Sequence, residues 1–124
     1  MKVLALDYGS ARTGVAVSDP TGTIARPIGV VKAVTDKKGF DDLLAVIRAE
    51  HPDRVVVGLP LTLKGDHGEQ AAETSAFVET LRAAVDVPVE TYDERFTSVL
   101  ADGDDSRAAA HLLSSYLEWQ SARR

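Results

Sequence analysis

The sequence predicts an α/β protein, with a mixed five-stranded sheet, helices on both faces and the chain order β-β-β-α-β-α-β-α. Two observations predict this class. The first third of the chain holds three strand-like segments in close succession, which favours antiparallel hairpins. The rest alternates segments of helical periodicity with short apolar runs, which requires parallel strands joined by crossover helices. The 124 residues contain no repeat, linker or low-complexity tract, so we expect one domain over residues 1–124.

The strands are predicted from apolar runs that end at turn residues. The continuous run Val55-Val56-Val57 is typical of a central parallel strand that is covered on both faces. The third strand is expected to place Ile24, Ile28 and Val30 on one side, and Pro27 indicates that it lies at a sheet edge. Strands are therefore expected over residues 2–6, 14–18, 23–31, 54–59 and 88–92.

The helices are predicted from apolar residues at i, i+3, i+4 and i+7. The first helix carries Phe40, Leu43, Leu44 and Ile47 on its apolar stripe. The second, over residues 69–84, is expected to bury Ala72, Ala76, Phe77 and Leu81. The last, over residues 106–120, is expected to bury Ala109, Leu112, Leu113, Tyr116 and Leu117. A loop over 61–68 and a helical turn over 97–101 complete the prediction.

The composition excludes several classes of function. The chain has no cysteine, which removes disulfides, thiolate catalysis and cysteine-bound zinc and fits a cytoplasmic location. No apolar run approaches the roughly 20 residues of a membrane helix, and no signal peptide is expected, so we expect no membrane partner. The net charge of −5 taken alone argues against nucleic-acid binding. Carboxylates that hold cations would offset this, because bound divalent ions make the local field more positive.

Three acidic sites lie at the ends of predicted elements: Asp7, Asp93-Glu94 and Asp105. Acids far apart in sequence can meet in one cleft when each ends an element, and hard divalent cations need such oxygen ligands. Gly9, just after Asp7, would let a ligand approach the backbone. Each acid also has a simpler interpretation: Asp7 as a turn acceptor, Asp93-Glu94 as a solvated loop, and Asp105 as a helix N-cap.

Helical spacing bears on Asp105. With Ala109, Leu112 and Tyr116 it falls at i, i+4, i+7 and i+11, which would put the acid on the stripe that faces the sheet. An acid on that face needs a partner, and a metal ion would supply one. Asp104 would then be the N-cap.

These motifs together resemble a known family. The string from Ala5 to Asp19, ALDYGSARTGVAVSD, resembles the amino terminus of the YqgF/RuvX proteins, small RNase H-fold nucleases described as Holliday junction resolvases and as pre-16S rRNA nucleases. VVGLPL at 56–61 is similar to the second block of the family and YDERFTS at 92–98 to the third. Asp105, with the helix that follows it, resembles the closing block.

The resemblance implies a two-metal phosphodiesterase in which Asp7, Glu94 and Asp105 hold Mg²⁺ or Mn²⁺. It implies that Arg12 and Arg95 clamp a phosphate. The partner would be branched DNA, precursor rRNA or both, bound by a homodimer. The candidates for contact with the substrate are Gly9, Ser10, Arg12, Lys64, Arg95 and Thr97.

One segment departs from the family pattern, and two other functions are open. Family members carry a longer, basic stretch before the final aspartate, whereas here the interval 99–104 is short and acidic, which removes positive surface near the proposed cleft. A non-catalytic adaptor of the same fold is the first alternative. The second is an ATPase of the actin type, because Asp7-x-Gly9-Ser10 also resembles a phosphate loop, although the chain is about half the size of that two-domain class.

Overall fold

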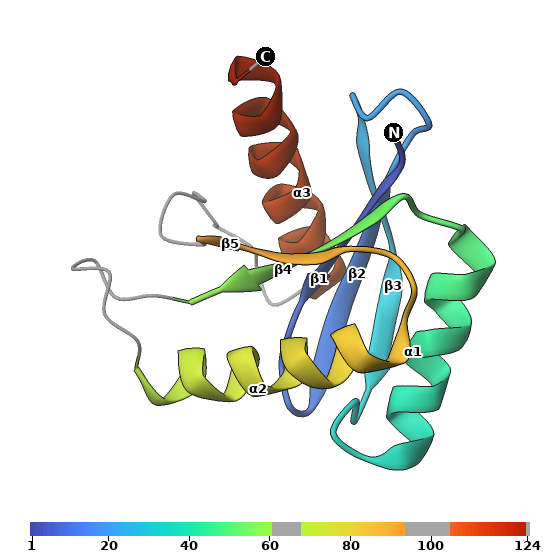
Figure 1. Cartoon of the computed structure of the whole chain (residues 1–124), viewed down its shortest axis with the longest axis vertical. Helices are drawn as coiled ribbons and strands as arrows, with labels where there is room; N and C mark the ends of the chain where they lie inside the picture. Colours follow the sequence, from blue (N-terminus) through green and yellow to red (C-terminus); the bar gives the residue numbers. More distant parts are fainter. Residues whose placement is uncertain (61–67, 94–104, 124) are drawn as a thin grey trace.

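One sheet and the helices packed on it make up the part of the chain that the structure describes (Figure 1). This computed structural model describes residues 1–60, 68–93 and 105–123, with only the backbone of Asp105. The elements are β1 (Val3–Asp7), β2 (Arg12–Ser18), β3 (Ala25–Lys32), α1 (Lys37–Glu50), β4 (Arg54–Leu59), α2 (Glu69–Ala84), β5 (Val89–Asp93) and α3 (Asp105–Ala122). The predicted helical turn over 97–101 lies outside the described residues.

The sheet is mixed, as predicted. Its strand order is β3-β2-β1-β4-β5. The pairs β1–β2 and β2–β3 are antiparallel, whereas β1–β4 and β4–β5 are parallel. Short turns suffice for the antiparallel half, while α1 and α2 provide the crossovers that parallel neighbours require. The order of elements along the chain is therefore the predicted β-β-β-α-β-α-β-α.

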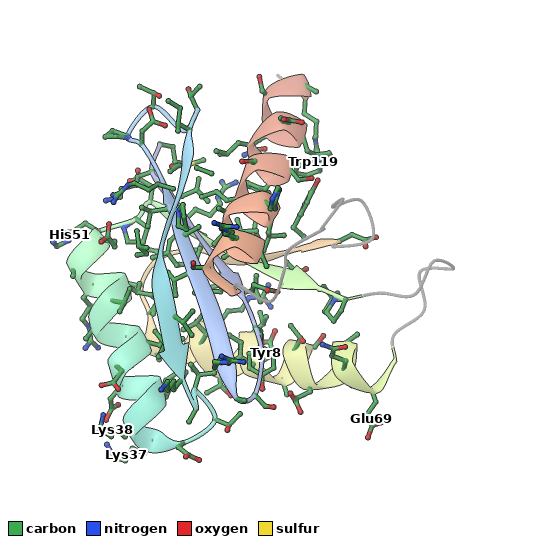
Figure 2. All side chains as sticks on the ribbon, turned by 180° about the vertical axis from the view of Figure 1, so that it is seen from behind. Tyr8, Lys37, Lys38, His51, Glu69 and Trp119 are labelled. Carbon is green, nitrogen blue, oxygen red and sulfur yellow. The ribbon has the colours of Figure 1, made fainter. Side chains whose placement is uncertain are left out.

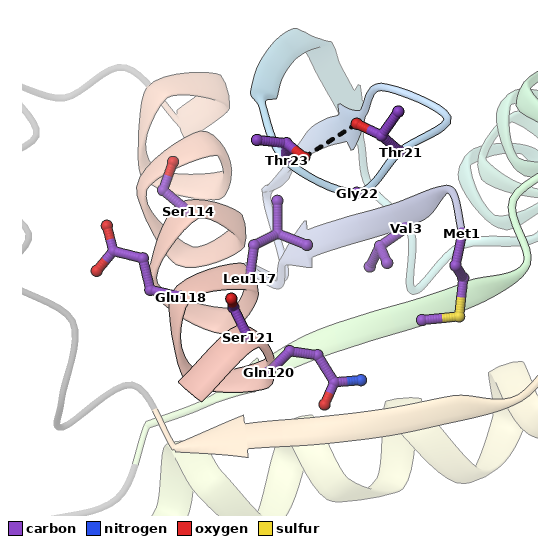
Figure 3. A pocket seen from close by; sticks show the side chains of 10 residues that line it. All are labelled: Met1, Val3, Thr21, Gly22, Thr23, Ser114, Leu117, Glu118, Gln120 and Ser121. Atoms are coloured by element: carbon purple, nitrogen blue, oxygen red, sulfur yellow. Dashed lines mark hydrogen bonds between the residues drawn. The ribbon is translucent and has the colours of Figure 1, made fainter. Parts of the chain in front are cut away.

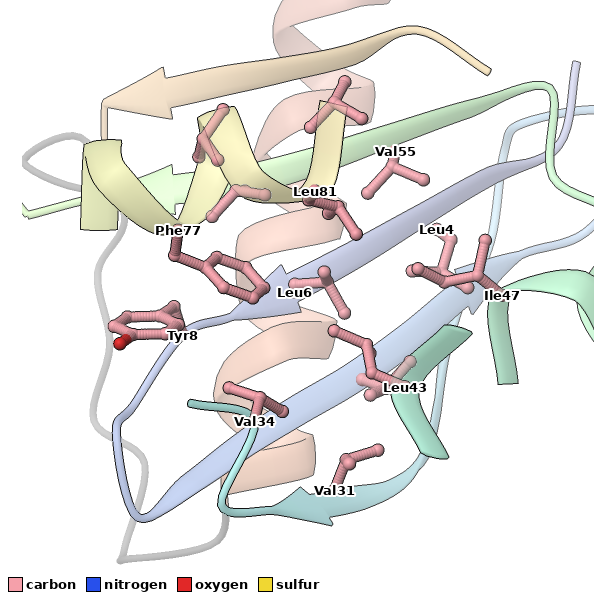
Figure 4. Close-up of a cluster of buried hydrophobic side chains, with 14 of the residues drawn as sticks. Leu4, Leu6, Tyr8, Val31, Val34, Leu43, Ile47, Val55, Phe77 and Leu81 are labelled. Carbon is pink, nitrogen blue, oxygen red and sulfur yellow. The ribbon is translucent and has the colours of Figure 1, made fainter. Parts of the chain in front are cut away.

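The central strand β1 is covered on both sides because its side chains alternate between the two faces. Leu4 and Leu6 join a core with α1 and α2, whose members include Leu43 and Leu81 (Figure 4). Val3 and Ala5 join a second core, which α3 covers. This arrangement confirms the prediction of helices on both faces. The same alternation directs the side chain of Asp7, two residues after Ala5, toward α3.

The buried stripe of α2 differs from the prediction. Ala72 and Ala76 are exposed, and the buried residues are Ala71, Thr74, Phe77, Val78 and Leu81. Phe77 and Leu81 were predicted, whereas Thr74 was not, and its hydroxyl donates to the carbonyl oxygen of Gln70 at 2.9 Å. Because this bond satisfies the hydroxyl within the helix, the side chain can be buried without an unpaired polar group.

The third strand lies at a sheet edge, as Pro27 indicated, but starts two residues later than predicted. The reason is the preceding turn, in which the Asp19 carboxylate accepts the N–H groups of Thr23 and Ile24, each at 2.8 Å. These bonds hold the pKa of Asp19 well below its usual range. Ile24 therefore lies outside the strand. The side chain of Val30, expected on the same side, is exposed, and its neighbour Val31 is buried instead.

No helix in the described ranges combines the length and the apolar character that crossing a membrane would require.

Candidate active site

Asp7 ends β1 at the centre of the sheet, where its backbone pairs with Gly14 of β2. Its side chain is half-buried. Because Val3 and Ala5 point to the α3 face, alternation directs Asp7 to that face too. A carboxylate is thus held at the end of a buried strand, between the sheet and the helix that begins at Asp105.

The ends of three parallel strands place the acidic sites along one edge. In the register of β1, β4 and β5, Leu6 pairs with Val57, and Val57 pairs with Thr91. Asp7 and Asp93 therefore follow at nearly the same level, two strands and about 10 Å apart at the usual strand spacing. In open α/β sheets, ligands bind outside the carboxyl ends of the strands. Glu94, the next residue in the chain, lies outside the described residues.

The third acidic site is the start of α3. Val3, at the beginning of β1, lines the same hollow as Leu117 and Gln120 near the end of α3, and the hollow has a volume of about 300 Å³ (Figure 3). The helix therefore runs opposite to β1, and its first residue lies toward the end of the sheet that carries Asp7. The structure describes the backbone of Asp105 there, as the start of the helix.

The loop between β1 and β2 is tied down by Thr13, a fully buried residue. Its hydroxyl donates to the carbonyl oxygen of Gly9 at 3.1 Å and accepts the N–H of the same residue at 3.4 Å. A Cβ on Gly9 would lie 2.4 Å from the carbonyl oxygen of Arg12, so no other residue fits this turn unchanged. Ser10 and Arg12 are exposed at its surface.

An open groove of about 550 Å³ lies beside this loop. The loop forms one wall, and the first two turns of α2 form the other. The residues that line it are Tyr8, Gly9, Ser10, Ala11, Arg12, Glu69, Gln70 and Glu73. Figure 2 shows Tyr8 in the middle of this region and Glu69 at the start of α2.

Tyr8 is the residue of this region that sequence reasoning missed as a site residue, together with Glu73. Burial raises the pKa of Tyr8 to about 12, and a hydrogen bond with the Glu73 carboxylate and the charge of that group add to the effect. The spacing gave no signal for this pair, because Glu73 lies on a different element, far along the chain. The adjacency of Tyr8 to Asp7 was the one available clue.

The structure thus brings four of the predicted site residues to one edge of the sheet: Asp7, Gly9, Ser10 and Arg12. Glu94, Lys64, Arg95 and Thr97 lie outside the described residues, as does the side chain of Asp105. Among the side chains that are described, no group of three His, Cys, Asp or Glu residues could hold a metal ion. The side chains of Glu94 and Asp105, two of the three expected ligands, are not among those described. His51 and His111 are both exposed.

Comparison with solved structures defines the class of fold. RuvC of Thermus thermophilus in complex with a Holliday junction substrate superposes with a TM-score of 0.63, at 17% identity, over 98% of this chain and 96% of that chain. The Holliday junction resolvase of fowlpox virus gives a TM-score of 0.61 at 15% identity, over 96% and 99% of the two chains. The chain therefore has the RNase H-like fold of these resolvases.

Comparison of sequences identifies the family. Residues 1–104 match the sequence model of the family described as "RuvX: Holliday junction resolvase". A Roseiflexus protein named "Putative pre-16S rRNA nuclease" is 44% identical over 101 residues, 82% of this chain and 72% of its own length. A Sulfurihydrogenibium protein of the same name is 39% identical over 132 residues, 94% of this chain and 90% of its own. The chain belongs to the RuvX family.

The longer of these alignments also shows that the chain is shortened. It spans 132 positions but covers 94% of the 124 residues, about 117, so about 15 of its positions have no residue of this chain. The shorter alignment uses 101 positions for 82% of the chain and leaves almost no room for a gap. The family match ends at residue 104.

Proposed function

We propose that this protein is a metal-dependent endonuclease that hydrolyses phosphodiester bonds in structured nucleic acid. The observation that carries the proposal is the position of Asp7. Its carboxylate is half-buried at the carboxyl edge of the parallel strands, on the face that α3 covers, in a chain that belongs to the RuvX family. The substrates named for related proteins, Holliday junctions and pre-16S rRNA, are the two candidates for this chain.

Asp7, Glu94 and Asp105 are proposed to hold Mg²⁺ or Mn²⁺. Carboxylate oxygens are the ligands that both ions prefer, and the half-buried Asp7 places its carboxylate at the carboxyl edge of the sheet. When bound, the ions would activate a water molecule as nucleophile and stabilise the leaving oxygen. The family match ends at residue 104, so Asp105 is proposed from its place at the start of α3.

The contacts with the substrate are proposed to come from the loop after β1 and from segments beyond it. Arg12 is exposed at the groove, where its guanidinium would bind a phosphate in bidentate fashion. Gly9 would let the protein backbone come close to the nucleic-acid strand, and Ser10 would offer a hydroxyl as a hydrogen-bond partner. Lys64, Arg95 and Thr97 complete the proposed set. The proposal includes a homodimer in the cytoplasm, which suits a substrate with two strands.

Cleavage assays test the proposal directly. Four-way DNA junctions and precursor 16S rRNA are incubated with the protein and Mn²⁺, and the native chain is compared with Asp7→Asn. We expect the variant to lose more than the roughly 10–100-fold that is typical of residues outside the metal shell. Asp86→Asn is the matched control, because Asp86 is an exposed acid in the turn before β5, away from the carboxyl edge. Equal cleavage by native protein and Asp7→Asn would remove Asp7 from the mechanism.

Two features of the chain favour a second function. The net charge of −5 and the shortened interval reduce the positive surface that holds nucleic acid. A non-catalytic adaptor that binds its partner without turnover would tolerate both features. Binding of a junction or of rRNA in the absence of cleavage, with the native chain and with Asp7→Asn alike, would favour the adaptor over the nuclease.

A further inference from the structure

The groove beside the loop after β1 continues into a second hollow, on the face of the sheet that α1 and α2 cover. This hollow has a volume of about 430 Å³ and lies between the start of α1 and the middle of α2. It shares Tyr8 and Glu73 with the groove, so these two residues form the boundary between them. Figure 2 shows Tyr8 between the start of α1, marked by Lys37, and the start of α2, marked by Glu69. The second hollow is lined by Tyr8, Val34, Thr35, Asp36, Lys37, Phe40, Glu73, Ala76, Phe77 and Thr80.

Aromatic rings form the apolar part of the second hollow. The rings of Tyr8 and Phe77 stack with their centroids 4.6 Å apart, and Phe40 meets Phe77 edge-on at 6.5 Å. Figure 4 shows Tyr8 and Phe77 side by side at the edge of the core, with the Tyr8 hydroxyl pointing away from the core. Because Tyr8 and Phe77 are buried, packing fixes both rings before any ligand arrives. A recess with such walls suits a flat ring, such as an unpaired nucleobase.

The charges of the groove dictate how a nucleic-acid strand would lie in it. Arg12 and Ser10 are on the wall formed by the loop, and Glu69 and Glu73 are on the wall formed by α2. A phosphate is attracted to the first wall and repelled by the second. A strand in the groove must therefore place its phosphates along the loop and turn a neutral edge toward α2. The parts of a nucleotide that can face a carboxylate are hydrogen-bond donors, either the ribose 2′-hydroxyl or an amino group of the base.

Glu73 can accept such a donor. Its carboxylate helps to raise the pKa of the Tyr8 hydroxyl, and an ionised carboxylate has about four acceptor positions in all. The side chain is exposed, so the other positions are open to the groove. Glu73 lies between the charged groove and the aromatic hollow, just as the sugar lies between the phosphate and the base of a nucleotide.

We propose that the groove and the second hollow form a subsite for one unpaired ribonucleotide, in which the aromatic hollow takes the base and the Glu73 carboxylate accepts a hydrogen bond from the ribose 2′-hydroxyl. The inference rests on the proposed function, because the groove starts at Tyr8, the residue that follows Asp7 at the carboxyl edge of the sheet. It assigns the recognition of an unpaired ribonucleotide to a part of the surface outside the expected metal ligands. It also makes Glu73 the residue that distinguishes RNA from DNA.

The test measures binding, so that it does not depend on cleavage. The dissociation constants of fluorescein-labelled oligo(rU) and oligo(dU) of equal length are determined by anisotropy in the Asp7→Asn background. We expect a preference for RNA of about tenfold, since a hydrogen bond to a charged acceptor is worth roughly that much. Glu73→Ala should weaken RNA binding and leave DNA binding equal or stronger, because it also removes a negative charge from the groove.

The matched control is Glu79→Ala, which removes a carboxylate from the same helix. Glu79 pairs with Arg82 and lines neither hollow. It should leave the preference for RNA unchanged. Phe40→Ala, which opens the base recess, should weaken binding of oligo(rU) relative to an abasic strand of the same length. Circular dichroism and thermal unfolding of each variant confirm that the fold is retained.

Several outcomes would overturn the inference. Two results would show that Glu73 contacts no donor. One is a ratio near one between the dissociation constants for DNA and RNA in the Asp7→Asn protein that keeps Glu73. The other is an equal rise in RNA and DNA affinity when Glu73→Ala is added. An effect seen with oligo(rC) but absent with oligo(rU) would mean that the donor is a base amino group and not the 2′-hydroxyl. The proposed function fails separately: RNA preference that depends on Glu73 without any cleavage by the native chain would retain the subsite and remove the nuclease.

Discussion

The hydroxyl of Tyr116 on α3 donates a hydrogen bond to the carboxylate of Glu90 on β5. The same hydroxyl accepts a hydrogen bond from the guanidinium of Arg54, at 2.8 Å. Burial raises the pKa of Tyr116, and the bond to Glu90 adds to this effect. The contact connects the helix that begins at Asp105 with the strand that leads to Glu94. It therefore holds two elements of the proposed metal site in a fixed relation.

Removing this hydroxyl should destabilise the protein. We expect Tyr116→Phe to lower the free energy of unfolding by about 1–3 kcal/mol, because two hydrogen bonds to charged groups are lost. The ring would still pack edge-on against Tyr92, whose centroid is 5.6 Å away. Urea unfolding can be followed through Trp119, the single tryptophan, whose ring lies 5.9 Å from that of Tyr116.

The control for this variant is Thr80→Ala, which removes an exposed hydroxyl that donates to the carbonyl oxygen of Ala76 within α2. It should change the free energy of unfolding by no more than about 0.5 kcal/mol. Equal losses for the two variants would mean that the bonds between α3 and β5 contribute nothing beyond an ordinary surface hydroxyl.

Gly9 should not tolerate a side chain. An added Cβ would lie 2.4 Å from the carbonyl oxygen of Arg12, so the loop must shift in Gly9→Ala. We expect cleavage to fall by about 100-fold, the size of effect that small misplacements near a reaction centre produce. In Gly68→Ala a Cβ would meet nothing within 4 Å, so this variant is the matched control. Unchanged activity in Gly9→Ala would contradict the role of the loop.

Much of the fold was predictable because it depends on local periodicity. The run from Arg54 to Leu59 and the helix from Glu69 to Ala84 have the predicted bounds, since turn residues flank each of them. On α2, Phe77 and Leu81 are buried as predicted, whereas Thr74 was missed because a threonine can satisfy its hydroxyl within the helix. That bond is invisible in a hydropathy pattern.

The candidate site was predictable only in part. Asp7 could be found because it directly follows an apolar run and precedes a glycine. Glu73 could not, because its meaning depends on a contact with Tyr8 that the packing of α2 on the sheet creates. The order of the strands, which brings Asp7 level with the end of β5, is likewise a property of the assembled sheet.

Metal binding should stabilise the native chain through Asp7. An ion that binds only the folded state adds about 2.7 kcal/mol at one hundred times its dissociation constant. We therefore expect millimolar Mn²⁺ to raise the midpoint of thermal unfolding, and EDTA to reverse the change. Asp7→Asn should lose most of the rise, while Asp86→Asn should keep it. A rise of the same size in native protein and Asp7→Asn would place the bound ion elsewhere.

The titration of Tyr8 should make the protein less stable at alkaline pH. Its pKa is raised to about 12 in the folded chain, whereas an unfolded tyrosine titrates near 10. The folded state therefore favours the protonated ring. This contribution is fully present below about pH 10 and is lost between about pH 10 and 12, for a total on the order of 1–3 kcal/mol.

Urea unfolding of native protein and Tyr8→Phe at pH 9 to 12 isolates this contribution, because other groups titrate alike in both proteins. The difference in their free energies of unfolding should shrink as the pH rises through that window. Glu73→Gln removes the charge that disfavours the tyrosinate, so the pKa of Tyr8 in the folded chain should fall toward 10. The pH range over which stability is lost should therefore end at a lower pH. Burial should still keep the pKa of Tyr8 above its usual value. Parallel pH curves for native protein and Tyr8→Phe would show that Tyr8 ionises in the folded chain as easily as in the unfolded one. The Tyr8 ring would then be open to water, and packing would not hold it in place between the groove and the second hollow before a ligand binds.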